Sequence, residues 1–229
     1  MDLKFLGTGS SFNNSLLNNS AYFIKGSSLY LVDCGETVFN ELINRKVLNS
    51  KIKHIYVYIT HTHSDHVGSL GTLASYAYYV MKEPLTLILP DDKKYIKSID
   101  KLMDIFGCNK KYKKKKASKF KKIKSEYRET NHSPILTCFS IIFRDKDKVI
   151  FYSGDTKDTK ILEELISNNE NIDKAYIDVC STDYPDNIHL YYKKLDKLNI
   201  DKNKIYGMHL NDIKLKYILL ESGYNVANS

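Results

Sequence analysis

Residues 60–66 read Thr-His-Thr-His-Ser-Asp-His and directly follow the apolar run Ile-Tyr-Val-Tyr-Ile at residues 55–59. This HxHxDH pattern brings four possible metal ligands together within six residues, in a chain with only seven histidines. The four are His61, His63, Asp65 and His66. Imidazole nitrogens and a carboxylate in a loop after a strand are typical of zinc sites. Side chains two residues apart in an extended segment point to the same side, so the stretch predicts a metal site.

The four ligands suit two neighbouring ions better than one, because a single tetrahedral ion could not take four groups from so short a segment. Three further residues each end a strand-like run and could complete the two shells: His132, Asp155 and His209. Taken singly, each of the three could equally be an ordinary polar loop residue. Together with the cluster they give seven ligands for two ions.

With these residues the chain resembles a metallo-β-lactamase-fold hydrolase over nearly its whole length. The resemblance includes Leu-Lys-Phe-Leu-Gly-Thr-Gly-Ser at residues 3–10, Leu-Val-Asp-Cys-Gly at residues 31–35 and the order of the metal-site motifs. It implies an α/β fold, namely a four-layer αββα sandwich. It also implies two zinc ions per subunit, one held by His61, His63 and His132, the other by Asp65, His66 and His209, with Asp155 bridging both.

Departures from particular branches narrow the chemistry that the resemblance implies. Position 63 is His where the flavo-diiron branch has Glu, which favours zinc over redox iron, with Mn²⁺ as a possible substitute. The antibiotic-hydrolysing branch, which has a Cys ligand, differs from this chain at the position of Asp155. We therefore do not expect β-lactam hydrolysis. Two divalent ions about 3.5–4 Å apart activate water and stabilise the charge of an in-line displacement, which makes a phosphodiester the natural substrate class.

Two residues are expected to act in catalysis. Asp65 would orient or deprotonate the attacking water, as its counterpart is thought to do in the phosphodiesterase branch. His189 precedes a helix-like stretch, where ribonuclease Z-like enzymes have a histidine that contacts the phosphate or protonates the leaving group. The alternative is that His189 is an ordinary histidine at a helix N-terminus. His54, at the start of a strand, is expected to be a surface residue.

Two substrate classes compete within the phosphodiesterase branch. Ribonuclease Z, the tRNA 3′-end endonuclease, usually carries a protruding arm and a His-Glu-Ala-Thr segment that supports the catalytic histidine. No arm is evident here, and the corresponding segment reads Tyr-Ile-Asp-Val-Cys-Ser-Thr at residues 176–182. The chain is more similar to the anti-Pycsar phosphodiesterases of phages and bacteria, which open cyclic mononucleotides such as cCMP and cUMP to counter host antiphage signalling.

That resemblance implies a nucleotide substrate, nucleoside 5′-monophosphate products and a homodimer, with cAMP and cGMP as further candidate substrates. RNA would be the partner if the chain processes tRNA 3′ ends instead. A glyoxalase-type thioesterase and a non-catalytic nucleotide-binding module are less favoured alternatives.

Length and composition favour one domain over residues 1–229, since 42% of the residues are hydrophobic and can form a sizeable core. No apolar stretch is long enough for a membrane span, and the N-terminus lacks the pattern of a signal peptide. We therefore expect a cytoplasmic protein without a membrane partner. The four cysteines form no CxxC pair and are expected to be reduced and mostly buried: Cys34, Cys108, Cys138 and Cys180.

The positive charge is concentrated in one segment. The net charge is +8, yet residues 110–124 contain ten lysines and no acidic residue, so the rest of the chain is slightly negative. One interpretation is a solvated loop and edge strand whose lysines discourage pairing with other sheets. The other is attraction of phosphate-bearing ligands. The run could then overhang the metal site, because it leads into the His132 segment. Both interpretations stay open.

Periodicity predicts strands at residues 22–25, 28–32, 55–60 and 85–89, and a hairpin of residues 136–143 and 148–153. Helices are predicted at residues 37–48, 68–81, 91–106, 158–167, 190–198 and 212–221. The roles of two smaller motifs stay open. The glycine-rich residues 7–10 are either a phosphate-binding loop or a tight turn. Asp33 either supports the metal site or belongs to a turn with Gly35.

Overall fold

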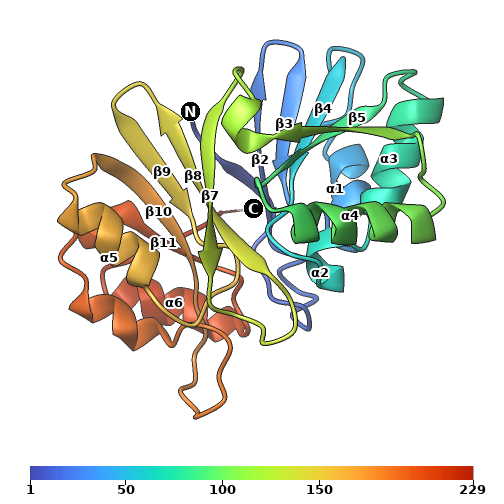
Figure 1. Ribbon diagram of the computed structural model, residues 1–229. Helices are drawn as coiled ribbons and strands as arrows, with labels where there is room; N and C mark the ends of the chain where they lie inside the picture. Colours follow the sequence, from blue (N-terminus) through green and yellow to red (C-terminus); the bar gives the residue numbers. More distant parts are fainter. Residues whose placement is uncertain (229) are drawn as a thin grey trace.

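Two six-stranded β-sheets pack face to face in the computed structural model, which describes residues 1–228 (Figure 1). Sheet 1 has the strand order β1-β2-β3-β4-β5-β6, and sheet 2 has the order β12-β11-β10-β9-β8-β7. Helices α1, α3 and α4 lie on the outer side of sheet 1, and α5 and α6 lie on the outer side of sheet 2. The predicted four-layer αββα sandwich is therefore confirmed.

The elements of sheet 1 and its helices are β1 (Lys4–Gly7), β2 (Ser20–Lys25), β3 (Ser28–Val32), α1 (Val38–Asn44), β4 (His54–Tyr58), α2 (Ser64–Val67), α3 (Leu70–Tyr79), β5 (Leu85–Leu89), α4 (Lys93–Ile105) and β6 (Tyr112–Lys116). Those of sheet 2 are β7 (Lys124–Thr130), β8 (Cys138–Asp145), β9 (Lys148–Tyr152), α5 (Lys160–Ser167), β10 (Ile172–Asp178), β11 (Ile205–Met208), α6 (Ile213–Glu221) and β12 (Asn225–Val226). The connections contain 3₁₀ helices at Ala117–Lys119, Tyr192–Lys197 and Lys202–Lys204.

Strand β4 shows how the sequence builds the layers. Its side chains alternate between the two faces of the sheet. Ile55 and Val57 pack in the cluster shared with α1, α3 and α4, whereas Tyr56 and Tyr58 pack in the cluster between the sheets. All four are buried. A strand covered on both faces reads as a continuous apolar run, which is why β4 was recognisable from sequence.

The prediction of an α-helix at residues 190–198 is wrong, because this segment contains only a 3₁₀ helix at Tyr192–Lys197. The cause is a backbone pairing with Cys180. The N–H of Cys180 donates to the carbonyl of Leu190 at 2.8 Å, and the N–H of Tyr192 donates to the carbonyl of Cys180 at 3.1 Å. Residues 190–192 are held extended by these bonds, so an α-helix cannot begin at Leu190.

The carboxyl ends of several strands meet at one edge of the sandwich. In sheet 1, β3 and β4 are parallel. In sheet 2, β9, β10 and β11 are parallel, and β7 runs in their direction because both β7 and β9 pair antiparallel with β8. The loops that leave these strands carry the candidate metal ligands. No helix in residues 1–228 is long and apolar enough to cross a membrane.

The end of the lysine-rich run, residues 119–124, lies away from that edge, contrary to one expectation from the sequence. The seven-residue strand β7 separates the run from His132, and seven extended residues span roughly 23 Å. The Nζ of Lys122 donates to the hydroxyl of Tyr56 near the start of β4. Strand β6 is the edge strand of sheet 1 and is formed by Tyr-Lys-Lys-Lys-Lys, as the edge-strand interpretation expected.

Candidate metal centre

The turn after β4 is fixed by Asp33, which follows β3. The backbone N–H and the hydroxyl of Thr60 each donate to the Asp33 carboxylate at 2.8 Å. His63 is extended and immediately precedes α2, whose single turn contains Asp65 and His66. The loop after β3 lies against this turn so closely that a Cβ on Gly35 would be 2.0 Å from the carbonyl oxygen of Asp65. Only glycine fits at position 35.

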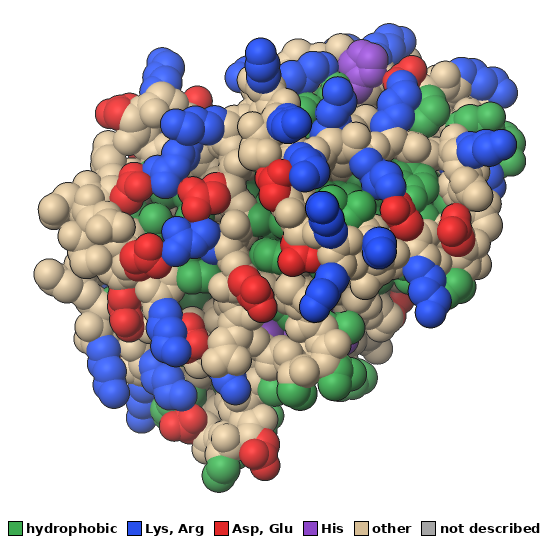
Figure 2. All heavy atoms as spheres, in the orientation of Figure 1, with side chains coloured by type: hydrophobic (Ala, Val, Ile, Leu, Met, Phe, Trp, Pro, Cys, Tyr) green, Lys and Arg blue, Asp and Glu red, His purple; other side chains and the backbone are tan. Residues whose placement is uncertain are grey.

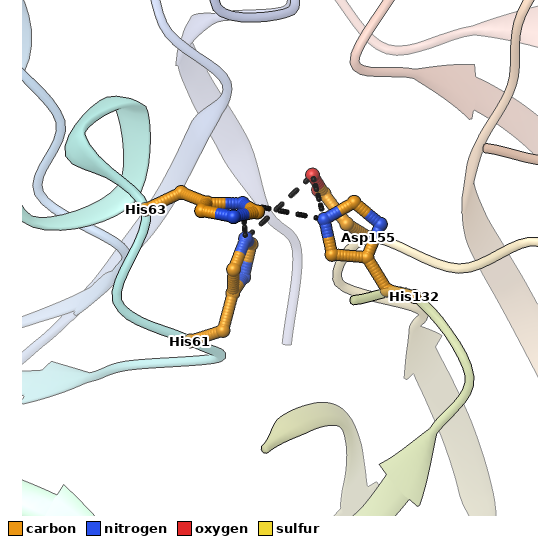
Figure 3. Close-up of side chains that lie close together, drawn as sticks. All are labelled: His61, His63, His132 and Asp155. Carbon is orange, nitrogen blue, oxygen red and sulfur yellow. Dashed lines mark hydrogen bonds and ion pairs between the residues drawn. The ribbon is translucent and has the colours of Figure 1, made fainter. Parts of the chain in front are cut away.

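One group of possible ligands consists of His61, His63, His132 and Asp155, whose polar atoms point toward one another (Figure 3). The Nδ1 of His63 is 3.0 Å from the Nε2 of His61 and 3.3 Å from the Nε2 of His132. An Oδ2 of Asp155 lies 3.8 Å from His61 Nε2 and 3.6 Å from His132 Nε2. Three imidazoles from two loops and one carboxylate therefore share a common centre.

A second group consists of Asp65, His66, Asp155 and His209. The Nε2 of His66 is 3.4 Å from Asp65 Oδ2 and 3.3 Å from Asp155 Oδ1. The Nε2 of His209 is 3.2 Å from Asp65 Oδ2 and 3.4 Å from Asp155 Oδ2. Within each group the ligand atoms lie within 4.8 Å of one another. The seven predicted residues thus meet in two groups, and Asp155 belongs to both.

The chemistry of these donors fits divalent cations. The Nε2 of His66 and the Oδ1 of Asp155 are buried and have no hydrogen-bond partner within residues 1–228, which is costly unless a cation satisfies them. Burial and the charge of neighbouring His66 hold the pKa of His61 well below its usual value. The His61 ring is therefore neutral and keeps a nitrogen lone pair available, which is the form that binds metals.

The carboxylates of this centre are held ionised. Burial opposes ionisation of Asp65, but His66 and His209 outweigh it and hold the pKa of Asp65 far below its usual range. Burial also disfavours protonated His209, yet Asp155 and the hydrogen-bonded carboxylates of Asp178 and Asp65 raise its pKa to about 10. A dense set of buried anions of this kind attracts positive charge, whether protons or metal ions.

Contacts behind the ligands orient them. The Nδ1 of His66 donates to Asp33 Oδ2 at 2.8 Å, and the Nδ1 of His132 donates to the carbonyl of Ile188 at 2.9 Å. Asp33 is fully buried. Carboxylates that accept from the second nitrogen of a histidine ligand fix its tautomer and raise its basicity. The geometry therefore favours the supporting role of Asp33 over a simple turn residue.

We expect the substitution Asp33→Asn to weaken metal binding by about 10 to 100-fold, because the amide no longer holds His66 as a charged acceptor does. The measurement is competition between the protein and a chromophoric chelator. Asp173→Asn is the matched control, since Asp173 pairs with Lys148 on the surface. Equal affinities for the two variants would contradict the assigned role.

Asp178 is a site residue that the sequence analysis missed. It ends β10, is fully buried and accepts from the Nδ1 of His189 at 2.7 Å. Its Oδ1 lies 3.3 Å from the Nδ1 of His209. Residues 176–182 lack a His-Glu-Ala-Thr sequence, but they contribute a carboxylate that contacts His189. The available signal for Asp178 was an acidic residue at the end of a strand, like Asp33 after β3. The signal could not be used because β10 itself was not predicted.

His189 stands at the mouth of the centre, with its side chain 23% exposed. Its ring centroid is 5.0 Å from that of His132 and 5.0 Å from that of His209. Burial opposes protonation, but the Asp178 carboxylate raises the pKa of His189. Because Asp178 occupies Nδ1, the Nε2 nitrogen is the one free to exchange a proton with a substrate.

A pocket of about 790 Å³ adjoins the centre at His132, a size typical of small-molecule sites. Its charged residues are two lysines and two aspartates, so it is close to neutral. The pocket is lined by Asn131, His132, Pro134, Lys157, Asp183, Tyr184, Pro185, Asp186, Asn187, Ile188 and Lys194.

Neither His54 nor the glycine-rich residues 7–10 belong to the centre. His54 begins β4, at the opposite end from His61. The N–H groups of Thr8, Gly9 and Ser10 donate to the carbonyls of residues 16, 17 and 210, which leaves none of them for a phosphate. A Cβ on Gly9 would lie 2.8 Å from two backbone oxygens, so the tight-turn interpretation is supported. All four cysteines are free and buried, as expected.

Comparisons with known proteins agree with this geometry. The family described as "Anti-Pycsar protein Apyc1" matches residues 1–227. The anti-Pycsar protein Apyc1 of Paenibacillus sp. (strain J14) is 30% identical over 179 residues, which are 72% of this chain and 71% of that protein. Ribonuclease Z of Methanocaldococcus jannaschii is 35% identical over 98 residues, 42% of this chain.

The match with that ribonuclease Z covers only 30% of the enzyme, so the chain spans less than a third of this relative's length. Among solved structures, the metallo-β-lactamase fold protein YhfI from Bacillus subtilis superimposes with a TM-score of 0.75 at 18% identity. It covers 99% of this chain, and the chain covers 96% of it. The chain therefore has the metallo-β-lactamase fold and belongs to the anti-Pycsar Apyc1 family.

Proposed function

We propose that the chain is a dinuclear zinc phosphodiesterase that hydrolyses cyclic mononucleotides to nucleoside 5′-monophosphates and so counters host antiphage signalling. The observation that carries the proposal is Asp155, which is shared by two groups of buried donors and is suited to bridge two ions. The candidate substrates are cCMP, cUMP, cAMP and cGMP. Manganese is a possible substitute for zinc, because the donors are nitrogen and oxygen atoms.

The proposed metal ligands are His61, His63 and His132 on one side, Asp65, His66 and His209 on the other, and Asp155 between them. When bound, two divalent ions would activate a water molecule and stabilise charge on the phosphate. The carboxylate of Asp65 orients that water and accepts its proton. The water oxygen then forms a bond to phosphorus while the bond from phosphorus to the 3′ oxygen breaks.

His189 supplies the proton that the departing 3′ oxygen needs. Its Nδ1 is held by Asp178 at 2.7 Å, which fixes the ring and stabilises its protonated form. The Nε2 proton passes to the 3′ oxygen, and the product is the 5′-monophosphate. Asp178 touches no substrate in this scheme and acts as a positioning residue.

The charge around the pocket favours a mononucleotide over tRNA. Only two lysines line it, and two aspartates offset them. A long polyanion such as tRNA is bound mainly through many phosphate contacts with lysine and arginine. The volume of about 790 Å³ suits one nucleotide. We further propose that the protein is cytoplasmic and forms a homodimer. Light scattering would measure the mass of the dimer.

The test is hydrolysis of a substrate panel by the zinc-loaded protein, read by chromatography. The panel contains the four cyclic nucleotides, a 3′-extended tRNA precursor and a glutathione thioester. We expect nucleoside 5′-monophosphates from cyclic nucleotides and an intact precursor. Asp65→Ala should lose this activity, whereas the matched control His54→Ala should keep it because His54 lies at the far end of β4.

Other outcomes of the panel would overturn the proposal in defined ways. Cleavage of the precursor alone would make the chain a compact ribonuclease Z. Turnover of the thioester alone would indicate a glyoxalase-type enzyme. Tight binding of a cyclic nucleotide without any turnover would indicate a nucleotide-binding module.

A further inference from the structure

Three neighbouring hollows share lining residues, and the first of them lies where β4 begins. The first, of about 440 Å³, is lined by His54, Tyr56 and Phe120 together with lysines. The second, of about 470 Å³, shares Lys122 with the first. The third, of about 410 Å³, shares Lys4 and Tyr22 with the second. Because they share lining residues, the three hollows adjoin one another and are together called the basic groove below.

The basic groove is remote from the metal centre. His54 lines its first hollow and begins β4, whereas the metal ligands start at His61, after β4 has ended. Seven extended residues cover roughly 23 Å. No residue that lines the groove also lines the pocket beside His132. A ligand in the groove would therefore not contact the reacting atoms.

The lining of the groove is strongly cationic. Figure 2 shows Lys and Arg side chains crowded over β6 and the start of β7, in the upper part of that view. The groove contains only three acidic residues, namely Asp2, Glu83 and Asp145. Against these stand eleven lysines and arginines: Lys4, Lys25, Arg45, Lys113, Lys115, Lys119, Lys121, Lys122, Lys124, Arg144 and Lys174.

The acidic residues are already neutralised. Glu83 pairs with Lys113 at 2.8 Å, Asp2 pairs with Lys174, and Asp145 pairs with the N-terminal amine. Seven exposed lysines remain without an ion-pair partner among residues 1–228: Lys4, Lys25, Lys115, Lys119, Lys121, Lys122 and Lys124. Mutual repulsion among these ammonium groups would be relieved by a ligand with several negative charges.

We propose that the basic groove binds the backbone of single-stranded nucleic acid. Seven unpaired lysines spread over adjoining hollows can contact several phosphates of one strand, whereas a single nucleotide would engage only one hollow. Tyr22 and Tyr206 are half-buried in the lining, and aromatic side chains in such a groove can contact bases. This binding site is independent of the proposed phosphodiesterase activity.

The test uses a fluorescein-labelled oligodeoxythymidine of about 20 nucleotides and fluorescence anisotropy across a salt series. If the seven lysines are engaged, the plot of log K against log salt has a slope of about −5, since each single-strand phosphate contact contributes roughly −0.7. Replacing Lys119, Lys121, Lys122 and Lys124 by alanine should reduce the slope by about 3.

The matched control replaces four exposed lysines of α4 by alanine, Lys93, Lys94, Lys97 and Lys101, and should leave the slope unchanged. Both variants should keep wild-type thermal unfolding and wild-type cyclic-nucleotide turnover. Equal losses in the two variants, or none in either, would overturn the proposal. Groove-dependent binding to vesicles of anionic lipid, without binding to the oligonucleotide, would also overturn the proposal. Tighter binding of a duplex than of the oligonucleotide would refute the preference for a single strand.

Discussion

Replacing Asp155 by Asn is expected to reduce phosphodiester hydrolysis by more than about a thousandfold. A single electrostatic contact to the reacting group is often worth about 10² to 10³ in rate, and Asp155 belongs to both ligand groups. The amide has nearly the same size as the carboxylate but cannot supply its negative charge to two ions. Metal content, measured by mass spectrometry of the purified protein, should fall from two ions toward one or none.

Asp173→Asn is the control for this experiment, because it removes a carboxylate that forms only a surface pair with Lys148. It should retain full metal content and turnover. Thermal unfolding by circular dichroism separates loss of metal from loss of fold. Two tightly bound ions and normal turnover in the Asp155→Asn variant would contradict the proposed bridging role of Asp155.

His189→Ala should lower kcat for cyclic nucleotides by about 10² to 10⁴, the usual contribution of a general acid. Metal content should stay at the wild-type level, because His189 lies outside the two groups that contain the seven proposed ligands. Asp178→Asn should lower kcat by about 10 to 100-fold, since it disturbs the orientation of His189 and His209 without removing either ring.

A change of leaving group distinguishes proton donation from a structural role. The p-nitrophenolate group departs without needing a proton, so hydrolysis of a p-nitrophenyl phosphodiester should be nearly as fast in His189→Ala as in wild type. His54→Ala is the matched control and should behave as wild type with both substrates. An equal loss on both substrates in the His189 variant would contradict its role as an acid.

Several features of the fold could be predicted from local sequence. Strand β5 was predicted with its observed bounds, because residues 85–89 form a short, mainly apolar run bounded by Pro84 and Pro90. The helix at residues 91–106 is observed as α4, and the side chain of Asp92 accepts from the N–H of Tyr95 as a cap. The lysines of β6 indicated an edge strand, and β6 lies at the end of sheet 1.

Strand β10 escaped prediction because its sequence, Ile-Asp-Lys-Ala-Tyr-Ile-Asp, contains three charged residues. Its strand conformation depends on pairing with β9 and β11, which are distant in sequence. The same long-range pairing delivers Asp178 to His189. A residue whose position is set by partners far along the chain leaves little signal in its own neighbourhood.

By itself the sequence determined the cluster at residues 60–66, because ligands separated by one or two residues stay together whatever the rest of the chain does. It also determined the continuous apolar runs that give central strands such as β4 two buried faces. Only the tertiary structure decided that His132, Asp155 and His209 converge on that cluster and that residues 119–124, the end of the lysine run, lie at the opposite edge. The physical reason is direction: parallel strands bring their carboxyl ends to one edge, and the single strand β7 carries the chain from the lysines to His132 across the full width of the sheet.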